Sequence, residues 1–190
     1  MESIRVGYAL TGSFCTFERS LSEMTKLKQS GYDIIPVMSE NAYGTDTRFG
    51  NSDDFVRRIE NISGRKVIST ITDAEPIGPK NLTDILVVLP CTGNTLAKLV
   101  NGIYDTAVTL AVKSHLRNQR PVVIGVSTND ALSTTAKNIG ALLNCKNYYF
   151  IPVKQDDCVK KPFSVVCDFE MVEKTIEAAL EQRQLQPILI

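Results

Sequence analysis

One short stretch near the middle of the chain constrains the fold more than any other. Residues 85–89 read Ile-Leu-Val-Val-Leu, an unbroken apolar run that is typical of a strand buried on both faces of a parallel sheet. Pro90 is expected to end that strand, and small polar residues follow directly before a helical pattern of apolar residues. A strand that leads into a helix start places open backbone N–H groups at the sheet edge, where phosphate commonly binds. A capped turn without a ligand is the alternative, since Thr and Asn favour helix starts.

Five further strand patterns alternate with amphipathic helices along the chain. These predicted strands are residues 4–10, 34–38, 67–71, 121–126 and 148–153. The alternation predicts an α/β fold with a doubly wound, six-stranded parallel sheet in the Rossmann-like order 3-2-1-4-5-6. The proline- and glycine-rich residues 73–79 are expected to be non-helical. Without a linker or an internal repeat, residues 1–190 are expected to form one domain.

The predicted strand order brings two polar loops together. Strands one and four are neighbours in that order, so the loop at residues 11–13 meets the loop at residues 92–95 over one crevice. A tight turn is the alternative for residues 11–13 taken alone. A single glycine stands in this first loop where the dinucleotide fingerprint has three, so a mononucleotide is favoured. The predicted cofactor-binding residues are Gly12, Ser13, Ser39, Thr92, Gly93, Asn94, Thr95 and Asn129.

The composition excludes several classes of function. Lys plus Arg and Asp plus Glu both number 21, so nothing in the net charge favours nucleic acid or an anionic membrane as partner. No apolar run approaches the roughly 20 residues of a membrane span, and no signal-peptide pattern is present, so a cytoplasmic protein is expected. Five scattered cysteines without a Cys-x-x-Cys pair indicate neither disulfides nor a zinc site. The one histidine, His115, is interpreted as a packing or capping residue rather than a base.

Two arginines are candidates for binding a substrate carboxylate. Arg48 lies in a polar loop between Gly44 and Gly50, which could hold its guanidinium over the mouth of the crevice. Arg117 is the second candidate, and a solvated surface arginine is the alternative in this type of position. The tail, residues 185–190, is unusually apolar for a chain end. It is expected either to pack back on the core or to meet another subunit.

The run Pro-Cys-Thr-Gly-Asn-Thr-Leu-Ala-Lys at residues 90–98 resembles a segment of the flavin-binding cysteine-decarboxylase superfamily, Pro-x-x-x-Asn-Thr-x-x-Lys. In that family the segment holds the flavin phosphate and ring, so the resemblance implies bound FMN or a similar phosphate-bearing ligand. Two departures count against decarboxylation. Glu75 and Pro76 stand where the decarboxylases have a histidine, and Asn129 alone is kept from their Pro-Ala-Met-Asn motif.

Six further segments are similar to the B subunits of dipicolinate synthases, namely residues 7–17, 45–50, 74–79, 116–118, 127–130 and 184–189. This resemblance implies a cytoplasmic oxidoreductase subunit of the mother cell in a sporulating bacterium. With an A subunit that binds NADP(H), it would convert dihydrodipicolinate, a small dicarboxylate, to dipicolinate. A homo-oligomer is also expected. The alternatives are a non-catalytic interaction subunit, docking through the tail and residues 160–162, and an FMN-dependent decarboxylase of a small acid. No catalytic residue is assigned.

Overall fold

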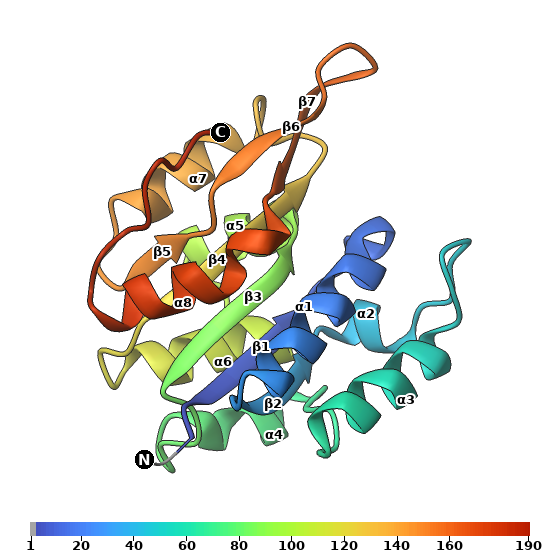
Figure 1. Cartoon of the computed structure of the whole chain (residues 1–190), viewed down its shortest axis with the longest axis vertical. Helices are drawn as coiled ribbons and strands as arrows, with labels where there is room; N and C mark the ends of the chain where they lie inside the picture. Colours follow the sequence, from blue (N-terminus) through green and yellow to red (C-terminus); the bar gives the residue numbers. More distant parts are fainter. Residues whose placement is uncertain (1–2) are drawn as a thin grey trace.

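The sheet is mostly parallel. The computed structural model describes residues 3–190, and within them seven strands form one sheet in the order β2-β1-β3-β4-β7-β6, with β5 also paired to β4. Strands β1 to β5 run parallel, and β6 and β7 form an antiparallel hairpin (Figure 1). The strands are β1 (Arg5–Leu10), β2 (Asp33–Met38), β3 (Ile85–Cys91), β4 (Val122–Thr128), β5 (Tyr148–Phe150), β6 (Val153–Asp157) and β7 (Lys161–Cys167). The predicted α/β fold class is confirmed.

Helices cover both faces of the sheet. One face packs against α1 (Phe17–Gln29), α3 (Ser52–Ser63) and α8 (Val172–Leu180), and the other packs against α4 (Ile71–Ala74), α5 (Gly93–Val100), α6 (Ala107–Leu116) and α7 (Ala136–Leu143) (Figure 1). The shorter elements are α2 (Glu40–Gly44), η1 (Phe14–Thr16), η2 (Glu75–Ile77) and η3 (Phe169–Met171).

Strand β3 contributes side chains to both hydrophobic cores. All seven residues of β3 are buried, and its side chains alternate between the two faces: Val87 and Leu89 pack with α1 and α8, whereas Leu86 and Val88 pack with α6. Each such buried side chain contributes about 1.5–3 kcal/mol relative to exposure. The prediction for residues 85–89 is confirmed. The prediction that Pro90 ends the strand is wrong, because β3 continues to Cys91.

The predicted strand at residues 67–71 is wrong in extent. Ile68 alone bridges to Val37 of β2, at the edge where a third strand was expected. The chain then turns into α4, because the Thr70 hydroxyl accepts the Asp73 N–H at 3.1 Å and starts a helix. Residues 73–79 were expected to be non-helical, but they include the end of α4 and all of η2, whose first turn tolerates Pro76.

The β6–β7 hairpin is missing from the sequence prediction. The sixth predicted strand, residues 148–153, divides into β5 and the start of β6, and the hairpin projects from the body of the molecule (Figure 1). Most of β6 is polar and exposed, so its sequence lacks the alternation of apolar and polar residues that predicts a strand. Its partner β7 joins the end of β4, pairing Val166 with Ser127 and Val165 with Thr128.

The apolar tail packs back on the sheet. The Val153 N–H donates to the Ile188 carbonyl at 2.9 Å, and the Ile190 N–H donates to the Val153 carbonyl at 3.1 Å. Leu189, between them, remains 74% exposed.

No helix within residues 3–190 is long and apolar enough to cross a membrane.

Candidate functional site

The loops after β1 and β3 are tied together by one threonine. The Thr11 hydroxyl donates to the Pro90 carbonyl at 2.8 Å and accepts the Thr92 N–H at 3.0 Å. The Thr11 N–H also donates to the Pro90 carbonyl, at 3.2 Å. Pro90 has no N–H to give to the sheet, but its carbonyl serves as the anchor for the neighbouring loop. The predicted convergence of these two loops is therefore confirmed.

The loop after β1 also contacts the end of β4. The hydroxyl oxygens of Ser13 and Ser127 lie 2.9 Å apart, and the Thr16 hydroxyl donates to the Ser13 carbonyl at 2.8 Å. Ser127 is only 5% exposed and is held in place by its pairing with Val166 of β7. Three strand ends thus meet around one group of hydroxyls. We use the name strand-end crevice for these three loops at the carboxyl edge of the sheet, residues 11–16, 92–95 and 127–130.

The start of α5 supplies open donors to the strand-end crevice. Thr92 caps the helix, and its hydroxyl accepts the Thr95 N–H at 3.4 Å. The N–H groups of Gly12, Gly93 and Asn94 have no hydrogen-bond acceptor within residues 3–190. Unpaired amides at a helix start carry partial positive charge and favour an anion.

A carboxylate fixes the third loop against α5. The Asp130 Oδ1 accepts the Thr128 hydroxyl at 2.6 Å, and its Oδ2 accepts the hydroxyls of Thr135 at 2.7 Å and Thr134 at 2.9 Å. Burial opposes the charged form, but these three hydroxyl donors outweigh it and hold the pKa of Asp130 below its usual value. A Cβ on Gly93 would lie 2.7 Å from the Asp130 Oδ1, so only glycine fits beside this carboxylate.

The remaining predicted cofactor residues differ in exposure. The Ser39 N–H donates to the Leu10 carbonyl at 3.0 Å, which places Ser39 beside the end of β1. Its hydroxyl accepts the Ala42 N–H at 3.3 Å and caps α2. Asn129 and Asn94 are both exposed, whereas Thr95 is buried.

The two predicted carboxylate-binding arginines lie in different places. Arg48 is exposed in the loop between α2 and α3, with its guanidinium 4.9 Å from the Phe49 ring centroid. Arg117 caps the end of α6, beside Gly78, whose added Cβ would lie 2.9 Å from the Arg117 Cδ. This is the edge at which β3 and β4 begin, so the structure does not bring Arg117 to the strand-end crevice. The physical reason is that α6 runs back antiparallel to the strands.

His115 is a structural residue. It is 1% exposed, its Nδ1 accepts the Thr83 hydroxyl at 2.8 Å, and its Nε2–H donates to the Pro121 carbonyl at 3.0 Å. Burial lowers the pKa of His115 to about 4. Within residues 3–190, no group of three or more His, Cys, Asp or Glu side chains is placed to hold a metal ion.

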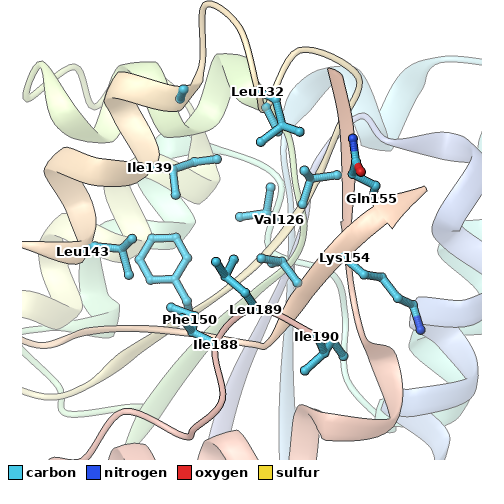
Figure 2. A pocket seen from close by; sticks show the side chains of 14 residues that line it. Val126, Leu132, Ile139, Leu143, Phe150, Lys154, Gln155, Ile188, Leu189 and Ile190 are labelled. Atoms are coloured by element: carbon cyan, nitrogen blue, oxygen red, sulfur yellow. The ribbon is translucent and has the colours of Figure 1, made fainter. Parts of the chain in front are cut away.

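A separate apolar cavity of about 500 Å³ lies on the other side of β4. Figure 2 shows Leu132, Ile139 and Phe150 around it, with Leu189 of the tail along one wall. Val126 of β4 faces this cavity, whereas its neighbour Ser127 contacts Ser13 in the strand-end crevice. Sequence reasoning did not predict this cavity, because it depends on where the tail docks.

Sequence reasoning also missed residues that build the strand-end crevice, namely Thr16, Ser127 and Asp130. The available signal was position: each follows or ends a predicted strand near the carboxyl edge of the sheet. Their contacts depend on strand register, which the sequence pattern does not show.

The chain matches a known protein family over most of its length. A flavoprotein family model matches residues 1–181. The chain is 45% identical over 186 residues to the B subunit of dipicolinate synthase from Bacillus subtilis (strain 168), and the match covers 98% of this chain and 93% of that protein.

Solved structures agree with that match. The crystal structure of the dipicolinate synthase B subunit from Bacillus halodurans C is similar with a TM-score of 0.90 and 41% identity, over 100% of this chain and 98% of that chain. The FMN-dependent cysteine decarboxylase SpaF is similar with a TM-score of 0.72 and 24% identity, over 94% of this chain and 96% of that chain. The second similarity shows the fold alone.

Proposed function

The chain belongs to the flavoprotein family and matches the B subunit of dipicolinate synthase over nearly its whole length, and from this premise we propose that it is the B subunit of such an enzyme. The observation that carries the proposal is the strand-end crevice. Hydroxyls from three strand ends and unpaired amides from a helix start converge there, in a chain whose family is named for flavin binding.

The donors of the strand-end crevice fit the phosphate of FMN. The amides of Gly12, Gly93 and Asn94 and the Ser13 hydroxyl can all donate to phosphate oxygens, and a helix start favours the negative charge. Asp130 brings a negative charge near the crevice, but its carboxylate already accepts hydrogen bonds from three threonine hydroxyls. Thr92, Thr95 and Asn129 complete the proposed cofactor set, with Ser39 at the rim.

The chemistry proposed for the assembled enzyme is the aromatisation of a dihydrodipicolinate ring to dipicolinate. The reaction would remove a hydride and a proton from the ring, and FMN, when bound, would supply a two-electron acceptor for the hydride. NADP⁺ on the A subunit is the proposed final acceptor of these electrons. The amides and hydroxyls of the strand-end crevice would orient the flavin through its phosphate.

Reconstitution tests this function. The A subunit is assayed with NADP⁺ and dihydrodipicolinate, alone and with this chain, and dipicolinate formation is followed by its absorbance. We expect turnover to depend on this chain and on FMN. Full turnover by the A subunit alone would leave this chain no part in the reaction.

A flavin-dependent decarboxylase is the second candidate, favoured by the shared fold with SpaF. The residues at the two decarboxylase positions argue against it. Glu75 and Pro76, which lie in η2, stand where the decarboxylases have a histidine. Asn129 alone is kept from the second motif, Pro-Ala-Met-Asn. Release of CO₂ from a small acid without a nicotinamide cofactor would favour this candidate over the synthase.

A further inference from the structure

We propose that Arg19 binds a carboxylate of the dicarboxylate substrate at the edge of the strand-end crevice. This inference rests on the proposed function and names a substrate contact that the predicted set of arginines does not contain. It is carried by the position of Arg19, by its ring contact and by its lack of a carboxylate partner.

The position of Arg19 follows from α1. This helix continues from the loop after β1, and Arg19 lies three residues after Thr16, whose hydroxyl contacts both Ser13 and Ser127. Residues three apart on a helix are neighbours, about 5–6 Å between their Cβ atoms. Arg19 is therefore one helical turn from the hydroxyls of the crevice.

A buried aromatic ring holds the guanidinium. The Arg19 Cζ lies 4.3 Å from the ring centroid of Phe169, which is 2% exposed and begins η3 just after β7. Helix α1 packs on the same face of the sheet as α8 (Figure 1), and η3 contacts both helices. Arg19 thus connects the first turn of α1 with η3, and the ring restricts its rotamers.

The charge of Arg19 has no carboxylate partner within the described chain. No carboxylate lies within ion-pair distance of it among residues 3–190. The acidic neighbours on α1 are already paired, Glu18 with Arg58 at 2.6 Å and Glu23 with Lys26 at 2.7 Å. An unpaired guanidinium beside a predicted anion site is available for an anionic ligand.

The N–H donors of Arg19 are also free. The Arg19 side chain makes no hydrogen bond within residues 3–190, so its five N–H donors stay available. Two parallel N–H donors match the two oxygens of a carboxylate. The flavin phosphate already has amide and hydroxyl donors at the other side of the crevice, so we assign Arg19 to the substrate carboxylate.

The test measures binding of dipicolinate to the FMN-loaded chain by calorimetry, with the wild type, Arg19→Gln, Arg19→Lys and Arg58→Gln. Arg58 is the matched control, because it is also an exposed arginine over a ring but pairs with Glu18. We expect Arg19→Gln to weaken dipicolinate binding at least tenfold and Arg19→Lys to weaken it less. Arg58→Gln should stay within twofold of the wild type.

Flavin binding separates the possible failures. FMN affinity should be the same in Arg19→Gln and the wild type; a selective loss of FMN but not of riboflavin affinity would show that Arg19 binds the phosphate and would overturn the assignment. Unchanged dipicolinate affinity in Arg19→Gln, or no dipicolinate binding by the FMN-loaded wild type, would also overturn it. If the wild type binds no FMN, the proposed function fails first.

Discussion

Hydrogen bonds of single hydroxyl groups connect the loops at the carboxyl edge of this sheet. Thr11 links two loops through four hydrogen bonds to residues 90 and 92, and the contact between Ser13 and Ser127 links a third loop. Each neutral hydrogen bond of this kind contributes about 0.5–1.5 kcal/mol. The network therefore sets the positions of the loops more than it sets global stability.

The lowered pKa of His115 predicts that the stability of the chain depends on pH. Its pKa is lowered from 6.5 to about 4 in the folded chain, so the unfolded chain binds a proton that the folded chain does not bind between these values. Stability is therefore lost as the pH falls through this window, by roughly 2 kcal/mol at pH 5 relative to pH 7.5. Urea unfolding at the two pH values measures this loss.

His115→Gln is the control for that experiment, because it removes the titrating group while carboxylates still titrate. We expect the variant to be less stable at pH 7.5 and the difference from the wild type to shrink by roughly 2 kcal/mol at pH 5. An identical pH dependence in both proteins would contradict this account of His115.

At the scale of single residues, the sequence predicted side chains that end strands but not their partners. Ser13 and Gly93 were predicted because each follows a strong strand pattern. Asp130 was not, because its role depends on three hydroxyls that gather around it only in the folded chain. Arg117 failed for a different reason: its helix carries it to the other edge of the sheet.

The start of α5 is the element on which the cofactor proposal depends. It packs so closely against the loop after β4 that a Cβ on Gly93 would lie 2.6 Å from the Thr135 Oγ1 and 2.7 Å from the Asp130 Oδ1. This contact fixes the helix start relative to residues 128–135. A helix start that moved would no longer direct its amides at the same point as Ser13.

Gly93→Ala should therefore damage both stability and flavin binding. We expect the free energy of unfolding to fall by about 1–3 kcal/mol because the added methyl group overpacks the contact. FMN affinity should fall by more than tenfold. Urea unfolding and a fluorescence titration with FMN measure the two effects.

Gly140→Ala is the matched control. Gly140 is an exposed residue in the middle of α7, and an added Cβ would meet nothing within 4 Å. This change should raise stability by roughly 0.5–1 kcal/mol and leave FMN affinity unchanged. If Gly93→Ala behaved like Gly140→Ala, the close packing of α5 would not matter for the site.

At the scale of elements, prediction succeeded where burial leaves a clear pattern. The apolar run of β3, which is buried on both faces, is readable in sequence. The β6–β7 hairpin is not, because its strands lie at a sheet edge with mostly exposed side chains. The Thr70 cap likewise overrides the strand propensity of the residues that follow it.

The whole molecule consists of two apolar cores on the faces of one twisted sheet, with the strand-end crevice at its carboxyl edge and an apolar cavity beside α7 (Figures 1 and 2). The order of the parallel strands was predictable, since right-handed crossovers leave few alternatives. The apolar cavity was not, because it needs the docked tail and the hairpin together.

The central claim is that the strand-end crevice binds the phosphate of a flavin mononucleotide. Calorimetric titration of the purified chain with FMN and, in parallel, with riboflavin tests this claim most directly. We predict one site per chain and at least tenfold tighter binding of FMN, since the amides and hydroxyls of the crevice contact the phosphate that riboflavin lacks. Equal affinities for the two flavins, or no heat with either one, would contradict the account.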